Sequence, residues 1–252
     1  MPQQHQADLV LSFTRVRTAL GILGMSLPVV LILGGILDQP RPDLATGRIE
    51  PTISDFYHTT YRDIFVGTLC AIGVFLISYR GYRREEGEWI DDDWLATAAG
   101  IGAFGVALFP NEGGGDVVVS MTQSMIGTDF TPTLHYLSAF VFFGSLAAFC
   151  FVKFARTSRT GRRKIYIACG WGMIAALVLT AIAVIFKRFV GGVGKDIVLD
   201  YNLIFWFEAM GIWAFGLSWL VKSKADLMFY GGAGQNAGKE RASSILDDEQ
   251  LN

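Results

Sequence analysis

Six long apolar stretches divide this chain of 252 residues, and each is close to the length that a helix needs to cross a bilayer. A spanning helix takes about 20 mostly apolar residues. Hydrocarbon offers no partner for exposed backbone groups, so continuous runs of this length favour helices over strands. The predicted spans are Thr18–Leu37, Ile64–Tyr79, Trp94–Pro110, His135–Phe154, Ile165–Phe186 and Leu203–Val221. The sequence therefore predicts an all-α polytopic membrane protein, a bundle of six transmembrane helices.

The composition agrees with this class of protein. Charged residues make up 17% of the chain and hydrophobic residues 52%, whereas a typical soluble domain is about 25% charged. The three cysteines, Cys70, Cys150 and Cys169, all fall inside apolar stretches and form no C-x-x-C pair. We interpret them as buried thiols rather than as disulfides or metal ligands.

The distribution of lysine and arginine predicts an orientation. If the connections alternate between two sides, fifteen of the 21 basic residues fall on the side of the termini and six on the other. By the positive-inside rule, both termini are then cytoplasmic. The predicted organisation is a cytoplasmic segment over residues 1–17, a transmembrane domain over 18–222 and a disordered cytoplasmic tail over 223–252. The predicted location is the inner (plasma) membrane of a bacterium.

Small and aromatic residues suggest how the spans are arranged. Trp94–Pro110 is dense in alanine and glycine, which let helix backbones approach closely in lipid. We therefore expect this span at the centre of the bundle. The aromatic-rich spans His135–Phe154 and Leu203–Val221 are expected to face lipid to a greater extent.

A polar stretch before the second span, PTISDFYHTTYRD, lies on the predicted outer side. It holds five candidate site residues: Ser54, Asp55, His58, Arg62 and Asp63. In a helix, Asp55, His58 and Arg62 would share one face. A structural interpretation stays open, in which Ser54 caps a helix and Asp55 interacts with the helix dipole. His58 and Arg62 would then face water or lipid headgroups.

Two further candidates lie in later spans on the same predicted side. His135 begins the fourth span, where a histidine can simply bond a loop carbonyl. Glu208 lies inside the sixth span, roughly 8 Å below its outer boundary at 1.5 Å per residue. A carboxylate in a span is costly and normally has a partner inside the bundle. Arg62, Asp63 and His135 are the predicted partners of Glu208.

This polar set permits more than one chemistry. Two histidines and three carboxylates could hold a zinc ion, with His58, His135 and Asp63 as ligands, or act as an acid–base set on a lipid headgroup. No H-E-x-x-H or H-x-x-x-H spacing supports zinc, and no nucleotide-binding loop is present. The basic run over residues 155–164 favours anionic lipid headgroups over nucleic acid.

Several short motifs give the chain a family resemblance. They are Pro51, Ile53, Ser54 and Asp55 in the first outer loop, Phe65 and Gly67 at the second span, His135 opening the fourth, and FWFEAMGIWAFGLSWLVK in the last. On these motifs the region 18–222 resembles the six-span DRAM-like superfamily, which includes proteins linked to GPI-lipid remodelling and many bacterial membrane proteins. The resemblance implies architecture more than activity. A more remote similarity is to zinc-dependent membrane hydrolases, whose paired histidines in the last span are lacking here.

The leading hypothesis is an integral membrane protein whose outer polar cluster binds lipid headgroups or a partner protein, including a second copy of itself. No cofactor is predicted under this hypothesis. Two alternatives stay open. One is a metal-dependent membrane lipid hydrolase using zinc, and the other is a small transporter in which Glu208 lines the path.

Overall fold

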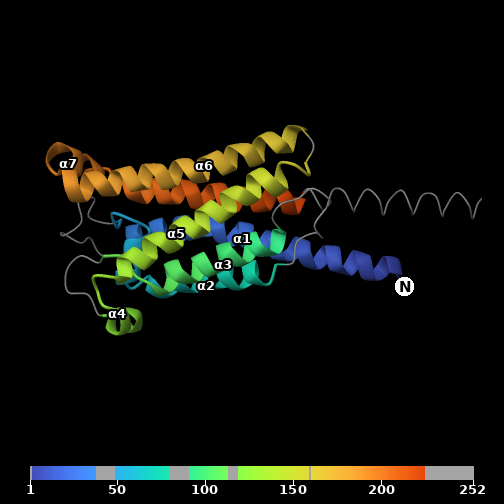
Figure 1. Ribbon diagram of the computed structural model, residues 1–252, viewed down its shortest axis with the longest axis horizontal. Coiled ribbons are helices and arrows are strands. Elements are labelled where there is room, and N and C mark those ends of the chain that lie inside the picture. The colour runs from blue at the N-terminus through green and yellow to red at the C-terminus, as the bar shows by residue number, and fades with distance from the viewer. Residues whose placement is uncertain (1, 38–48, 80–90, 113–118, 159, 225–252) are drawn as a thin grey trace, which may run out of the picture.

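The computed structural model describes residues 2–37, 49–79, 91–112, 119–158 and 160–224, with side chains from residue 14 onward. These residues are overwhelmingly helical and contain no strand. Figure 1 shows the long helices running side by side along one axis, with α4 and α7 at one end and the start of α1 at the other. The long helices are α1 (Pro2–Leu37), α2 (Arg62–Ile77), α3 (Asp92–Leu108), α5 (Thr131–Ala148), α6 (Thr160–Ile185) and a C-terminal helix (Leu203–Lys224).

Short elements complete the bundle. A 3₁₀ turn, η1 (Ser54–His58), lies between α1 and α2, while α4 (Met121–Ile126) and α7 (Gly192–Asp200) join longer helices. Two π-helical turns, η2 (Phe149–Phe154) and η3 (Phe186–Val190), extend α5 and α6. We refer to the end of the bundle that carries α4 and α7 as the α4/α7 end.

Four helical stretches are long and apolar enough to cross a membrane, so the chain is a helical membrane protein. They are Thr14–Leu37, Thr131–Phe154, Thr160–Val190 and Leu203–Lys224. The two remaining predicted spans coincide with the helices α2 and α3, whose 16 and 17 residues correspond to ~24 and ~26 Å. That is shorter than the hydrocarbon core of about 30 Å.

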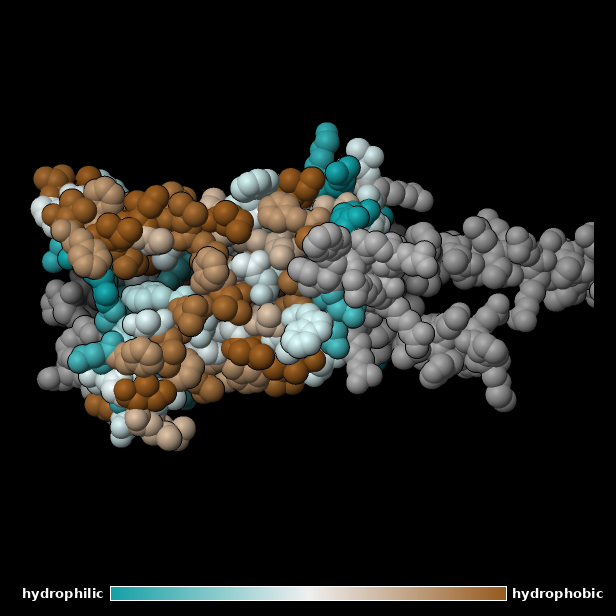
Figure 2. Space-filling model, in the orientation of Figure 1, coloured by the Kyte–Doolittle hydropathy of each residue, from teal (hydrophilic) through white to brown (hydrophobic). Residues whose placement is uncertain are grey.

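The packing confirms one expectation and corrects another. Most of α3 is buried, as its small residues predicted. The C-terminal helix, expected to face lipid, is instead the most buried of the four long stretches. Its aromatic side chains Phe205, Phe215 and Trp219 are almost fully buried. The aromatic side chains of this helix therefore pack in the core, and α6 belongs to the least buried of the four stretches; its exposed apolar side chains are visible as a brown band in Figure 2.

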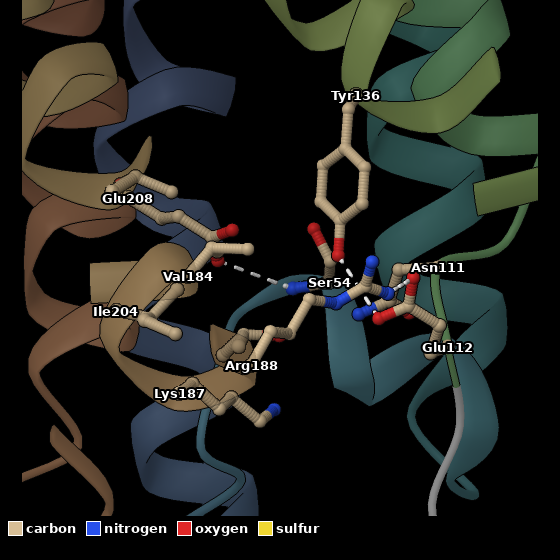
Figure 3. Close-up of a pocket in the computed structure, with 11 residues that line it drawn as sticks. Ser54, Asn111, Glu112, Tyr136, Val184, Lys187, Arg188, Ile204 and Glu208 are labelled. Carbon is tan, nitrogen blue, oxygen red and sulfur yellow. Dashed lines mark hydrogen bonds and ion pairs between the residues drawn. The ribbon is translucent and has the colours of Figure 1, made fainter. Parts of the chain in front are cut away.

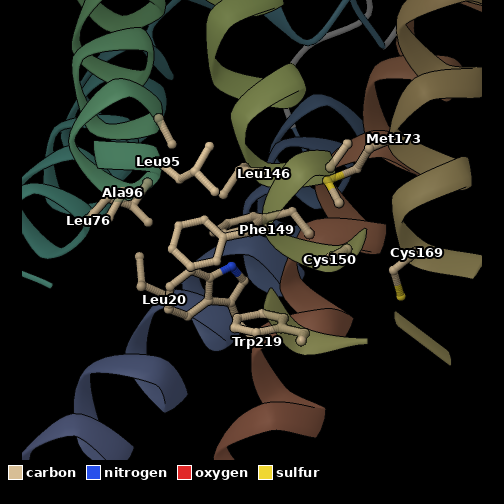
Figure 4. Close-up of a cluster of buried hydrophobic side chains, with 14 of the residues drawn as sticks. Leu20, Leu76, Leu95, Ala96, Leu146, Phe149, Cys150, Cys169, Met173 and Trp219 are labelled. Atoms are coloured by element: carbon tan, nitrogen blue, oxygen red, sulfur yellow. The ribbon is translucent and has the colours of Figure 1, made fainter. Parts of the chain in front are cut away.

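The aromatic core occupies the half of the bundle remote from the α4/α7 end. Figure 4 shows Trp219 between Leu20 of α1 and Phe149 of η2. The rings of Trp219 and Phe149 have centroids 5.7 Å apart. In addition, the buried ammonium of Lys153 lies 2.9 Å from the carboxylate of Asp92 in α3. The two halves of the bundle therefore differ, since the large aromatic cluster lies in one and the cavity described below opens in the other.

The predicted boundaries of the transmembrane domain differ from the helices at both ends. α1 runs without a break from Pro2, so the helix crosses the predicted boundary at residue 18. The C-terminal helix continues to Lys224, and the predicted disordered tail beyond it lies outside the described residues.

The contact between α3 and α5 gives a stability test. A Cβ on Gly102 would lie 2.7 Å from the backbone nitrogen of Phe142 in α5, whereas a Cβ on Gly144 meets nothing within 4 Å. We expect Gly102→Ala to destabilise the protein by about 1–3 kcal/mol, because the two backbones must separate. Gly144→Ala, the control, should be neutral or stabilising by up to about 1 kcal/mol. Thermal unfolding in detergent measures both, and equal melting temperatures would contradict the close approach.

Candidate functional site

An apolar cavity of about 440 Å³ opens in the half of the bundle nearest the α4/α7 end. Its apolar walls come from six elements and include Leu27, Phe65, Val106, Phe142, Leu177 and Ile212. Three side chains on its outer rim, Phe140, Val178 and Ile185, are at least half exposed. The cavity therefore opens sideways, between α5 and α6, onto the face that lipid would cover. Figure 2 shows a hollow in this face, with hydrophilic side chains in its floor.

Three of the predicted site residues, Ser54, His135 and Glu208, form the polar end of this cavity. The Ser54 Oγ lies 3.0 Å from Nε2 of His135, and His135 Nδ1 lies 2.7 Å from the carbonyl oxygen of Phe109. A carbonyl only accepts hydrogen bonds, so the proton of the neutral imidazole is on Nδ1. Nε2 is then an acceptor, and the Ser54 hydroxyl donates to it.

Ser54 does not cap the turn that it begins, contrary to the structural interpretation of the sequence. No side-chain capping bond is made at the start of η1. Instead, the hydroxyl of Thr52 accepts the backbone N–H of Asp55 at 2.8 Å. The Ser54 hydroxyl bonds to the imidazole of His135 instead.

Glu208 holds the segment that carries Ser54. Its Oε2 accepts the backbone N–H of Ile53 at 2.7 Å and, more weakly, that of Ser54 at 3.4 Å. The predicted partners Arg62, Asp63 and His135 are thus wrong. The first N–H groups of a helical turn lack partners within the turn, and a carboxylate inside a span needs donors. The backbone N–H groups of Ile53 and Ser54 therefore gain an acceptor, and the Glu208 carboxylate gains donors.

A second polar group lies beside the cavity, around Asn111. The Asn111 Nδ2 donates to Asp55 Oδ1 at 2.6 Å, and its backbone carbonyl accepts from His58 Nε2 at 3.2 Å. Burial raises the pKa of Asp55 above its ordinary value, while Lys187 and the bond from Asn111 oppose the rise. Asn111 was missed by the sequence analysis, because a single asparagine after a proline reads as an ordinary loop residue.

The last two predicted site residues lie away from the cavity. The guanidinium of Arg62 stacks over the ring of Tyr57, 4.3 Å from its centroid. Asp63 is exposed at the start of α2. Neither residue lines the cavity, so the seven predicted residues form one group at the cavity and one around Asn111, with Arg62 and Asp63 in neither.

The geometry does not fit the zinc alternative. Among the described residues, no three histidine, cysteine, aspartate or glutamate side chains converge on a point. His58 and His135 bond to different carbonyls, and Asp63 is exposed in the first turn of α2, outside the cavity. We derive no metal-dependent step from this arrangement.

A cationic rim borders the polar end of the cavity. Figure 3 shows Arg188 of η3 ion-paired with Glu112, whose carboxylate also accepts the Tyr136 hydroxyl at 3.3 Å. Lys187 lines the same small hollow as Ser54 and Glu208. π-helical turns often occur at functional sites. The sequence could have indicated this rim, because Lys187 and Arg188 are adjacent cations on the predicted outer side, which has few basic residues.

No family model, curated protein or solved structure matches this chain. The fold and the cavity therefore define the class on their own: a helical membrane protein with a lateral apolar cavity that ends in a serine, a histidine and a glutamate.

The pKa of Asp55 predicts how stability depends on pH. Because folding raises this pKa, the protonated carboxyl favours the folded state, and this contribution is lost as pH rises through the folded-state value. Asp55→Asn keeps an acceptor for Asn111 but cannot ionise. We expect the variant to melt at a higher temperature than the wild type at neutral and alkaline pH, and the gap to shrink toward pH 4. Melting curves in detergent between pH 4 and 9 test this, and parallel profiles would refute it.

Proposed function

We propose that this protein binds the acyl chain of a membrane lipid in its lateral cavity, with the lipid headgroup at the α4/α7 end. The carrying observation is the shape and chemistry of the cavity. Its lining is mostly apolar, it opens toward the lipid-facing side, and its few polar lining residues are Ser54, His135, Tyr136, Thr180 and Glu208. Its volume is within the range of about 300–1,000 Å³ that is typical of ligand sites.

The rim supports an anionic headgroup. Lys187 and Arg188 border the polar end of the cavity, together with the Tyr136 hydroxyl. An arginine side chain is well suited to bind phosphate oxygens. The Arg188–Glu112 ion pair is about 40% exposed on each side, so it is in contact with solvent and can exchange partners at modest cost.

The position of the site along the bundle is consistent with the level of the lipid headgroups. At the α4/α7 end, Met121 and Met125 of α4 and Val193 and Ile197 of α7 present exposed apolar side chains. Short helices with such surfaces lie in the interfacial layer of a membrane. The polar end of the cavity would then be close to the ester and phosphate groups of the surrounding lipids.

We further propose six spans, with α2 and α3 completing the four long stretches, and both termini in the cytoplasm of a bacterium with the site facing outward. The start of α1 and the end of the C-terminal helix lie at the same end of the bundle (Figure 1), as an even number of spans requires. The excess of basic residues at that end supports the orientation. This architecture is also what the resemblance to the DRAM-like superfamily implies.

Cysteine accessibility tests the orientation. Thr60, beside η1, and Thr160, at the start of α6, are both exposed and lie toward opposite ends. In a background with the three native cysteines replaced by alanine, Thr60→Cys should react with a membrane-impermeant maleimide in intact spheroplasts. Thr160→Cys should react only after permeabilisation. The reverse pattern would overturn the proposed orientation.

Photo-crosslinking tests lipid binding. The probe is a phosphatidylglycerol with a diazirine in one acyl chain, presented in vesicles with the reconstituted protein. We expect crosslinks to peptides of α5 and α6 that line the cavity. Ala181 lines the cavity, whereas Ala175, which is also exposed, does not. Ala181→Trp should therefore reduce crosslinking inside the cavity several-fold, and Ala175→Trp is the matched control. Equal crosslinking in the two variants would reject the site.

A further inference from the structure

The hydrogen bond between Ser54 and His135 has the arrangement of an activated nucleophile. A serine is activated when its hydroxyl bonds to a general base that is itself oriented by a third group. Here the base is His135 Nε2, 3.0 Å from the Ser54 Oγ, and the orienting group is the carbonyl of Phe109, 2.7 Å from Nδ1. The distance from Ser54 Oγ to Nε2 is within the hydrogen-bond reach that a general base requires.

The pair is also accessible to a ligand. Ser54 and His135 both line the apolar cavity, so a molecule that fills it contacts them directly. Ser54 makes no capping bond at the start of η1, and Glu208 accepts the backbone N–H groups of Ile53 and Ser54. The Ser54 hydroxyl thus bonds to a side-chain base and also faces a cavity, which a purely structural serine does not require.

We propose that Ser54 is the nucleophile and His135 the general base of a lipid ester hydrolase, which acts on the acyl ester of the lipid bound in the cavity. This inference rests on the proposed lipid site and adds a reaction to it. With the acyl chain along the apolar walls, the ester carbonyl would lie at the polar end, where Ser54 is.

The reaction balances with water as the only co-reactant. The Ser54 Oγ attacks the ester carbonyl carbon while its proton moves to His135 Nε2. The bond from that carbon to the alcohol oxygen then breaks, and His135 returns the proton to the leaving alcohol. Water attacks the acyl-serine, again with His135 as base, which releases a fatty acid and restores the Ser54 hydroxyl.

The residues around the pair fit this sequence of steps. Charge on the carbonyl oxygen in the transition state requires a donor, and the Tyr136 hydroxyl and the Arg188 guanidinium share the small polar hollow with Ser54. Glu208 touches neither Ser54 Oγ nor His135, so it is a positioning residue that acts through the backbone of η1.

Covalent labelling provides the test. The purified full chain in detergent is treated with a long-chain fluorophosphonate, which phosphonylates activated serines. Intact mass should show one adduct per chain, and peptide mapping should place it on Ser54. His135→Gln should slow labelling about 100-fold, the contribution typical of a general base. Ser54→Ala should abolish it. Ser124→Ala, which removes an exposed serine of α4, is the control and should label like the wild type.

The outcomes separate this inference from the lipid site. The wild-type mapping does not depend on any variant folding, so an unlabelled wild type, or an adduct on another serine, overturns the nucleophile. If photo-crosslinking by the lipid probe succeeds in the wild type and in Ser54→Ala while no adduct forms, only the hydrolase is rejected. If Ser54 is labelled but the lipid does not crosslink, Ser54 is an activated serine and the lipid substrate is rejected. Release of fatty acid from phosphatidylglycerol vesicles, absent in Ser54→Ala, completes the expected result.

Discussion

The hydrogen bond from the backbone of Ile53 to Glu208 is the interaction on which the site depends. A carboxylate inside a span must find donors, and here it finds them in the loop segment before α2 rather than in another side chain. The same region is tied to the C-terminal helix again, because Phe205 donates its N–H to the carbonyl of Pro51 at 3.1 Å. A polar loop is thereby drawn down into the end of the bundle, and Ser54 comes within hydrogen-bond distance of His135 on α5.

The polar residues around Asn111 and those that line the cavity have different roles. Asn111 joins Asp55 and His58 beside the cavity, and these contacts stabilise the connections between helices. Ser54, His135 and Glu208 face the cavity, and they are the groups that a bound molecule meets. Solid aromatic packing around Trp219 at the other end of the bundle keeps the helices together. A second buried cluster, which includes Leu31, Phe56 and Phe205, packs the half that contains the cavity.

The sequence was informative about helices and about Glu208, and less so about partners. Continuous apolar runs predict helices because lipid allows little else, and a carboxylate within such a run signals an interaction. The partner of Glu208 could not be predicted, because it is a backbone N–H and carries no residue identity. For Ser54 the sequence left a capping role and a site role open, and only the fold shows that the hydroxyl of Thr52, not that of Ser54, accepts the N–H of Asp55. Lys187 and Arg188 lie in a π-helical turn, which shifts the helical phase that a periodicity argument relies on.

The sideways opening between α5 and α6 determines how a ligand reaches the polar end. A molecule that enters there never has to leave the bilayer or pass through water. Occupancy then follows the mole fraction of that lipid in the surrounding leaflet, not its concentration in solution. Two membranes of different composition would load the same protein to different extents, and dilution of the vesicles in buffer would leave the loading unchanged.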